Sequence, residues 1–168
     1  FSANAGGRTC TAKECFGWEP GLDNPTYLQP VNDAPGIREV GGGTWGKKSN
    51  ITPASISKRL KSLGINVKAL SIRENGVSST GRVWSLKVET EKSGELTLNR
   101  RQTKRILGLF GPIRSHMFKL SPMKKGRQGV VGHGFGHGVG FSQWGAELFA
   151  RQGRNYIDIL THYYTDVE

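Results

Sequence analysis

Two histidines lie in a run of alternating glycines near the C-terminal end of the sequence. Residues 132–140 read GHGFGHGVG, with His133 and His137 four positions apart. Alternate glycines would stabilise a β-strand poorly, so this segment is predicted to be a loop in which shape matters. Glycine lets a polymer, or another stretch of backbone, approach closely. The two imidazoles are suited to hydrogen bonding and to proton transfer near neutral pH.

The spacing in this loop argues against four other kinds of site. A dinucleotide-binding loop needs G-x-G-x-x-G, whereas the spacing here is G-x-G-x-G, and no Gly-Lys-Ser/Thr of a Walker loop follows. Two histidines at this spacing share one zinc ion on a helix, but not in an irregular loop. Residues 140–144, GFSQW, depart from the G-x-S-x-G sequence of serine hydrolases at the last position. The alternative that both histidines only brace the loop against the core remains open.

Ser142 and Gln143 follow this loop directly. A helix is predicted over residues 142–152, with its end at Gly153, so both residues lie at its start. The first backbone N–H groups of a helix have no partner within it and could bind an oxygen-rich ligand. We therefore include both residues in the candidate site.

Other elements must hold this loop in place, and their sequence signals mix helices with strands. Thr52, Pro53 and Gly64 are typical of the cap, first turn and end of a helix over residues 53–63. Alternation over residues 83–88 predicts a strand, and Ser93-Gly94 a hairpin turn. Further strands are expected at 67–72, 96–98, 117–120 and 130–131, and further helices at 100–109, capped by Asn99, and after Asn155.

The predicted order of elements indicates an α+β fold. Antiparallel, hairpin-linked strands and three to four helices follow one another without the regular alternation of a parallel sheet. Residues 1–168 are assigned to a single domain or to the C-terminal part of a larger one. Its segments are a loop-rich 1–50, a helix-strand-hairpin-helix 51–125, and 126–168 with the glycine/histidine loop and terminal helices.

The sequence carries a formal net charge of +11, with 24 Lys and Arg against 13 Asp and Glu. Such a charge favours anionic polymers, for example nucleic acid, an acidic cell wall or a membrane surface. The basic residues form no single long run and no group with stacking aromatics, so no specific nucleic-acid partner is expected. A basic surface without a specific partner remains an alternative.

The two cysteines, Cys10 and Cys15, are compatible with a disulfide in an exported protein or with two thiols in a cytosolic one. The pair offers too few ligands for a structural zinc site, and neither a metal nor a cofactor is expected. No stretch reaches the roughly 18 apolar residues of a membrane span, so no transmembrane segment is predicted. The sequence starts at Phe1 without an initiator Met or a signal peptide, and we expect it to lack an N-terminal portion.

Residues 136–146, GHGVGFSQWGA, resemble the G-H-G-V-G-x-S-Q-x-G-A signature of the SpoIID/LytB family, the proteins similar to stage II sporulation protein D. The resemblance continues through residues 150–164, which are similar to the family's ending A-x-x-G-x-x-Y-x-x-I-L-x-H-Y-Y. Residues 2–9, SANAGGRT, resemble its S-x-x-x-G-G-x-T segment. The middle of the chain also fits, at Tyr27-Leu28, Val31, Gly81-Arg82-Val83, Leu107-Gly108-Leu109, Arg114-Ser115 and Phe118.

The resemblance implies peptidoglycan chemistry. SpoIID proteins are lytic transglycosylases that cut MurNAc–GlcNAc bonds in glycan strands without stem peptides, and in sporulation they act with an amidase, SpoIIP. LytB relatives are described as enhancers of a wall amidase. In the family mechanism one glutamic acid serves first as acid and then as base, while the sugar's 6-hydroxyl attacks and an anhydro product forms.

The catalytic residue of this chain is unknown. The family's glutamate lies in an A-x-x-A-Q-A-V-A-A-R-T-Y-like helix upstream of the S-x-x-x-G-G segment, and this sequence contains no such helix. Glu14, Glu39 and Glu147 do not occupy the family's position. The Cys/His cluster that holds zinc in some members is also missing.

The resemblance further implies a groove that binds peptidoglycan glycan strands. Its substrate-binding residues would be Ser2, Asn4 and Arg8 on one side, and His133, His137, Ser142 and Gln143 on the other. A SpoIIP-like wall amidase is a further expected partner. The expected location is extracytoplasmic, in the cell wall or anchored to the membrane through a missing N-terminal segment. The alternative is a non-catalytic module that binds the wall or enhances an amidase.

Overall fold

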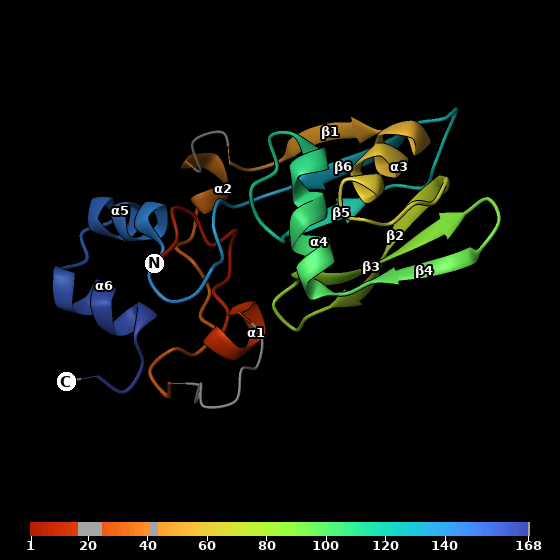
Figure 1. Ribbon diagram of the computed structural model, residues 1–168. Coiled ribbons are helices and arrows are strands. Elements are labelled where there is room, and N and C mark those ends of the chain that lie inside the picture. The colour runs from red at the N-terminus through yellow and green to blue at the C-terminus, as the bar shows by residue number, and fades with distance from the viewer. Residues whose placement is uncertain (17–24, 41–43, 168) are drawn as a thin grey trace. The chain divides into compact units, whose positions relative to one another are not determined.

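The computed structural model describes residues 1–16, 25–40 and 44–167, which form two units (Figure 1). The terminal unit consists of Phe1–Trp45 and His133–Glu168, and the central unit of Gly46–Gly132. Each unit has its own apolar core. The two ends of the chain therefore share one core, and the residues between them build another.

Two three-stranded antiparallel sheets frame the central unit. One has the strand order β1-β6-β5 and the other β2-β3-β4. Leu86 and Val88 of β3 are buried, as the alternation predicts, and Gly94 with its positive φ of 68° starts β4 after a turn. The strands are β1 (Lys47–Ile51), β2 (Ala69–Val77), β3 (Val83–Thr90), β4 (Gly94–Leu98), β5 (Phe118–Leu120) and β6 (Gln128–Gly132).

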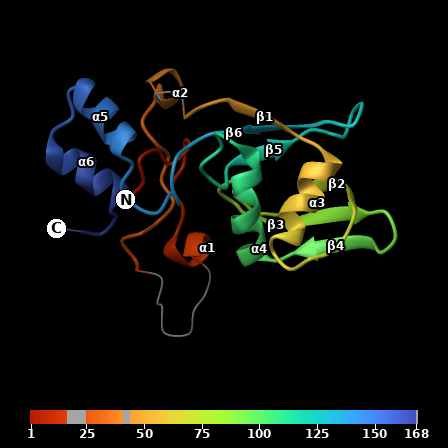
Figure 2. The same cartoon turned by 45° about the horizontal axis from the view of Figure 1, so that its top comes forward.

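Capped helices cover the strands of this unit. The Thr52 hydroxyl accepts the N–H of Ser55 at 3.2 Å, and Oδ1 of Asn99 accepts the N–H of Gln102 at 3.0 Å. Both caps confirm the sequence prediction. α3 packs on β2, and α4 on β3 (Figure 2). The helices are α3 (Pro53–Lys61), α4 (Arg100–Ile106) and the 3-10 helix η1 (Leu107–Phe110), which continues α4.

Side-chain amide and carboxylate groups join the two sheets where β2 forms an edge. The buried Gln128 donates from Nε2 to the carbonyls of Ile72 and Ser121, and its Oε1 accepts the N–H of Ile72 at 3.2 Å. Oε1 of Glu74 accepts the N–H of Leu120 at 2.6 Å. These bonds satisfy backbone groups that the edge strand would otherwise leave unpaired.

The terminal unit is built from short helices and from loops that pair with one another. Buried apolar side chains of its last two helices form the core, with Phe149, Ile159 and Tyr163 as the main members. None of the helices in the described part of the chain has the length and apolar character of a bilayer span. The helices of this unit are α1 (Ala12–Phe16), α2 (Ile37–Val40), α5 (Gln143–Arg151) and α6 (Tyr156–Tyr163).

The structure confirms the α+β class and the predicted helices, and it differs from expectation in three places. β1 overlaps the segment expected to be loop-rich. The sequence did not predict this strand, because it has no apolar alternation and only its last residue, Ile51, is buried. β2 continues past the expected 67–72 to Val77, with irregular pairing around Gly76. The short helices α1 and α2 add to the expected three to four. The division into 1–50, 51–125 and 126–168 stays a prediction.

Replacement of Gln128 by leucine should destabilise the central unit by about 2 to 4 kcal/mol, because the N–H and carbonyl of Ile72 would stay buried without partners. Chemical denaturation of both proteins measures this difference. Gln143→Leu makes the same change at an exposed position and should cost less than about 0.5 kcal/mol. Equal effects of the two substitutions would show that Gln128 does not join the sheets.

Candidate functional site

The glycine/histidine loop pairs with the first residues of the chain. Asn4 and Phe135 exchange two backbone hydrogen bonds, of 3.1 and 2.8 Å, and the N–H of Cys10 donates to the carbonyl of Gly138 at 2.8 Å. The two segments that resemble the SpoIID/LytB family at opposite ends of the sequence are therefore neighbours in the terminal unit.

The close approach of these segments explains two of the glycines. Gly134 and Gly136 have positive φ angles of 83° and 114°. A Cβ at Gly134 would lie 3.0 Å from Cα of Gly6, and one at Gly136 would lie 3.1 Å from Cβ of Ser2. Any other residue would be strained and would push the loops apart. The sequence predicted a polymer or a backbone at this position, and the structure places the backbone of residues 2–6 there.

The first N–H groups of α5 are already bonded. The N–H of Gln143 donates to the carbonyl of Ser2, and that of Trp144 to the carbonyl of Ala3, both at 3.0 Å. The expectation that these groups bind an oxygen-rich ligand is therefore wrong. Carbonyls of the N-terminal segment take the place of that ligand.

Ser142 lies in a buried polar cluster centred on Asp33. Its hydroxyl donates to Oδ2 of Asp33 at 2.8 Å, and the hydroxyl of Tyr163 donates to Oδ1 at 2.6 Å. Burial, and then the Asp33 carboxylate, raises the pKa of Tyr163 far above its usual range, so the phenol remains a donor. A Cβ at Gly145 would overlap both the carboxylate and the phenol, so the cluster also accounts for this glycine.

Ser2 and Asn4 are buried as well, at 3% and 1% exposure. The Ser2 hydroxyl accepts the N–H of Gly138 at 2.7 Å. The Asn4 amide donates to the Thr44 hydroxyl at 2.9 Å, and its oxygen accepts the N–H of Gly6 at 2.8 Å. Like Ser142, these side chains bond within the unit and hold its loops together.

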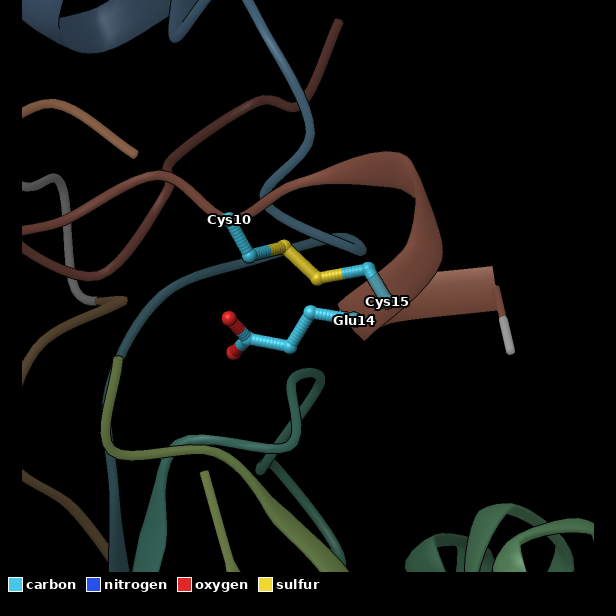
Figure 3. Close-up of side chains that lie close together, drawn as sticks. All are labelled: Cys10, Glu14 and Cys15. Atoms are coloured by element: carbon cyan, nitrogen blue, oxygen red, sulfur yellow. A yellow bond between two sulfur atoms is a disulfide. The ribbon is translucent and has the colours of Figure 1, made fainter. Parts of the chain in front are cut away.

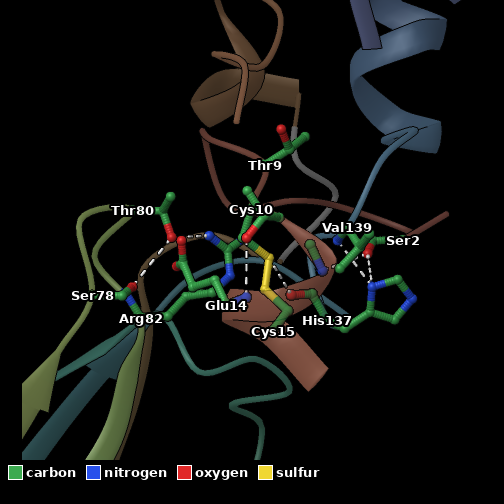
Figure 4. The surroundings of a disulfide bond; sticks show 12 residues. Ser2, Thr9, Cys10, Glu14, Cys15, Ser78, Thr80, Arg82, His137 and Val139 are labelled. Atoms are coloured by element: carbon green, nitrogen blue, oxygen red, sulfur yellow. Dashed lines mark hydrogen bonds between the residues drawn. A yellow bond between two sulfur atoms is a disulfide. The ribbon is translucent and has the colours of Figure 1, made fainter. Parts of the chain in front are cut away.

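His137 is half-buried and has a defined hydrogen-bonding state. Its Nδ1 accepts the N–H of Val139 at 2.9 Å and lies 3.5 Å from the Ser2 hydroxyl (Figure 4). Because Nδ1 accepts a bond from the backbone, the neutral ring carries its proton on Nε2. The ring also lies 4.9 Å from that of Phe16.

His133 belongs to an aromatic stack. Its ring lies 4.6 Å from that of Trp45, at an interplanar angle of 13°, and the Arg38 guanidinium lies 5.3 Å from the Trp45 ring centroid. The remaining predicted site residues, Arg8 and Gln143, are exposed. The structure thus brings four of the seven predicted residues to accessible or half-buried positions.

A disulfide between Cys10 and Cys15, whose Cα atoms are 6.3 Å apart, closes the loop that leads into α1 (Figure 3). Of the two states that the sequence allowed, the structure shows the paired one. Glu14 lies beside the bond, and its carboxylate and the two sulfurs are all within 4.8 Å of one another. Within the described residues this is the group with metal-ligand spacing, but sulfurs joined in a disulfide are not thiolate ligands.

Sequence reasoning missed two residues around the site. Asp33 lies in a loop, VNDA, without any periodic or motif signal, and its partners come from distant segments. Trp45 follows the glycine triplet 41–43, which lies outside the described residues. An aromatic residue close to a run of glycines is a weak signal, and nothing in the sequence connects it with His133.

Asp33→Ala should lower the free energy of unfolding by about 3 kcal/mol, because the hydroxyls of Ser142 and Tyr163 and the N–H of Ala34 would lose their acceptor. Denaturation followed by tryptophan fluorescence measures the loss. The neighbouring exposed Asn32→Ala should change stability by less than about 0.5 kcal/mol. A small effect at Asp33 would contradict its central place in the terminal unit.

Two curated relatives match the chain in sequence. The chain is 32% identical to stage II sporulation protein D of Bacillus amyloliquefaciens over 128 residues, which cover 74% of this chain and 35% of that protein. It is 51% identical to stage II sporulation protein D of Bacillus subtilis (strain 168) over 35 residues, or 21% of this chain and 10% of that protein. The chain therefore spans about a third of the longer-matching relative, and its resemblance to SpoIID proteins is confirmed as a relationship.

A family model matches residues 44–140, which is more than half of the sequence. That match covers the whole central unit and continues into the glycine/histidine loop. On this match the chain belongs to the family described as "Domain of unknown function (DUF8618)".

Proposed function

We propose that the terminal unit binds glycan strands of peptidoglycan, and that the protein acts on the cell wall in sporulation, outside the cytoplasm. The observation that carries the proposal is the pairing of residues 2–10 with the glycine/histidine loop. The relationship to stage II sporulation protein D supports it. The disulfide is consistent with an oxidising location.

The accessible side chains of the paired loops and of the start of α5 suit a sugar polymer. His133, His137, Arg8 and Gln143 offer hydrogen-bonding groups for hydroxyl and amide substituents. Phe135 in the glycine/histidine loop and Trp144 in the first turn of α5 add apolar ring faces, at 41% and 40% exposure. Ser2, Asn4 and Ser142 would act indirectly, because their bonds fix the loops that carry these groups.

In this proposal the chain supplies the substrate-binding part of a lytic transglycosylase. Cleavage of the MurNAc–GlcNAc bond needs a glutamic acid as acid and base. That group would come from a helix upstream in the native protein or from another chain, and a SpoIIP-like amidase would prepare the strands.

A second candidate is a non-catalytic module that binds the wall or enhances an amidase. It is favoured by the composition of the paired loops, because residues 2–10 and 132–140 contain no carboxylate side chain. Both candidates use the same glycan-binding loops, and they differ in the products that form.

His137→Ala and Gln143→Ala should each weaken binding to insoluble peptidoglycan about tenfold, the loss expected for one polar contact of about 1.4 kcal/mol. Pull-down over a range of wall concentrations measures this. His137→Asn separates contact from support, because its Oδ1 can replace Nδ1 as acceptor for Val139 while Nε2 is lost.

Binding should fall equally in His137→Asn and His137→Ala. The exposed Asp158→Asn on α6 serves as the control and should bind like the unmodified chain. Unchanged binding in both His137→Ala and Gln143→Ala would refute the glycan-binding assignment. Loss in His137→Ala alone, with normal binding in His137→Asn, would assign His137 a purely structural role.

Muropeptide analysis distinguishes the two candidate functions. Residues 1–168 alone should bind denuded glycan strands and release no anhydro-sugar ends, because the paired loops contain no carboxyl group to act as acid and base. Mass spectrometry of the soluble fraction measures these products. Anhydro ends produced by the chain alone would show that one of its own carboxyl groups cuts the glycan.

A further inference from the structure

The charge of the chain is concentrated in the central unit. Residues 46–132 contain nineteen of the 24 Lys and Arg residues but only four of the 13 Asp and Glu residues, so this unit has a formal net charge of +15. The terminal unit has a net charge of −4. The overall charge of +11 therefore describes neither unit, and an anionic partner would be attracted to the central one.

Part of this charge surrounds a pocket of about 440 Å³ within the central unit. Lys58 and Lys61 reach it from the last turn of α3, Lys68 from the segment before β2, and Lys92 from the turn between β3 and β4. All four lysines are exposed. One carboxylate, that of Glu91, is also in the lining, so the pocket keeps a net charge of +3.

Local roles do not account for these four lysines together. Lys58 and Lys61 are favourable near the C-terminal end of a helix because of its dipole, but Lys68 and Lys92 belong to no helix. Glu91 pairs with Lys68 at 3.4 Å, with both side chains about half exposed or more, and such a pair contributes little. Within the described residues, Lys58, Lys61 and Lys92 have no carboxylate within 4.0 Å.

We propose that this lysine pocket binds phosphate groups of a polyol-phosphate polymer, a chain of alcohol units joined by phosphodiesters. Several lysines around one pocket suit phosphate, which lysine binds as a point charge. A repeating polyanion would also satisfy the wider +15 charge of the unit. This proposal concerns the central unit and does not depend on glycan binding by the terminal unit.

Two other anionic ligand classes fit the pocket less well. Single-stranded nucleic acid binds through stacking of its bases on aromatic side chains, and no aromatic residue lines this pocket. Carboxylate polymers are recognised best by the planar fork of arginine, and the lining contains lysine without arginine. Polyol phosphates present neither bases nor carboxylates.

Fluorescence anisotropy with labelled poly(glycerol phosphate) tests the proposal on the full chain. The double charge reversal Lys58→Glu/Lys92→Glu should weaken binding at least about tenfold at moderate salt, because each reversal replaces an attraction by a repulsion. The matched control, Lys119→Glu/Lys124→Glu, changes the net charge of the same unit equally at exposed positions outside the pocket. It should weaken binding less than about threefold.

Equal losses in the two double variants would overturn the proposal, since binding would then follow net charge alone. Single-stranded DNA and polyglutamate of matched charge form the competing arms and should bind at least about tenfold more weakly. Equal or tighter binding of either to the unmodified chain, with the same loss in Lys58→Glu/Lys92→Glu, would assign the pocket to that polymer instead. If charge reversal lowers the melting temperature, Lys58→Gln/Lys92→Gln repeats the measurement.

Discussion

The buried carboxylate of Asp33 is the interaction on which the terminal unit depends. A carboxylate is tolerated inside a protein only where donors surround it, and here they come from a loop, from the start of α5 and from α6. Ser142 links Asp33 to the N-terminal segment, because its hydroxyl also accepts the N–H of Ala5. The position of the N-terminal segment, and through it that of the glycine/histidine loop, is therefore tied to one side chain.

Local signals in the sequence were sufficient for the parts of the fold that depend on local bonds. The caps Thr52 and Asn99 and the turn before Gly94 were predictable because their partners lie within a few residues. β1 was not, because its pairing with β6 joins distant segments and its own residues are mostly polar. Long-range pairing, and not propensity, makes this segment a strand.

The same distinction applies to the candidate site. Glycine spacing predicted a close approach, and the residue types predicted hydrogen bonding, but the approaching group could not be named from the sequence. The glycines make room for the chain's own N-terminal backbone. Polar residues that were predicted as ligand contacts instead bond within the unit: Ser142 donates to Asp33, and Asn4 donates to Thr44. Their residue types predicted hydrogen bonding correctly, whereas the partners of these bonds depended on the tertiary structure.

The terminal unit is interrupted in sequence, and its halves meet where the central unit begins and ends. The rings of Trp45 and His133 stack at 4.6 Å. Lys47 and Gly132, the first and last paired residues of β1 and β6, lie opposite each other in the sheet. The central unit therefore has the geometry of an inserted domain, whose entry and exit lie side by side. During synthesis it has all its strands before residues 133–167 exist, whereas Asn4 and Cys10 must wait for their partners. A product that ends at Gly132 would therefore contain every strand of the central unit but neither the Asn4–Phe135 nor the Cys10–Gly138 pairing.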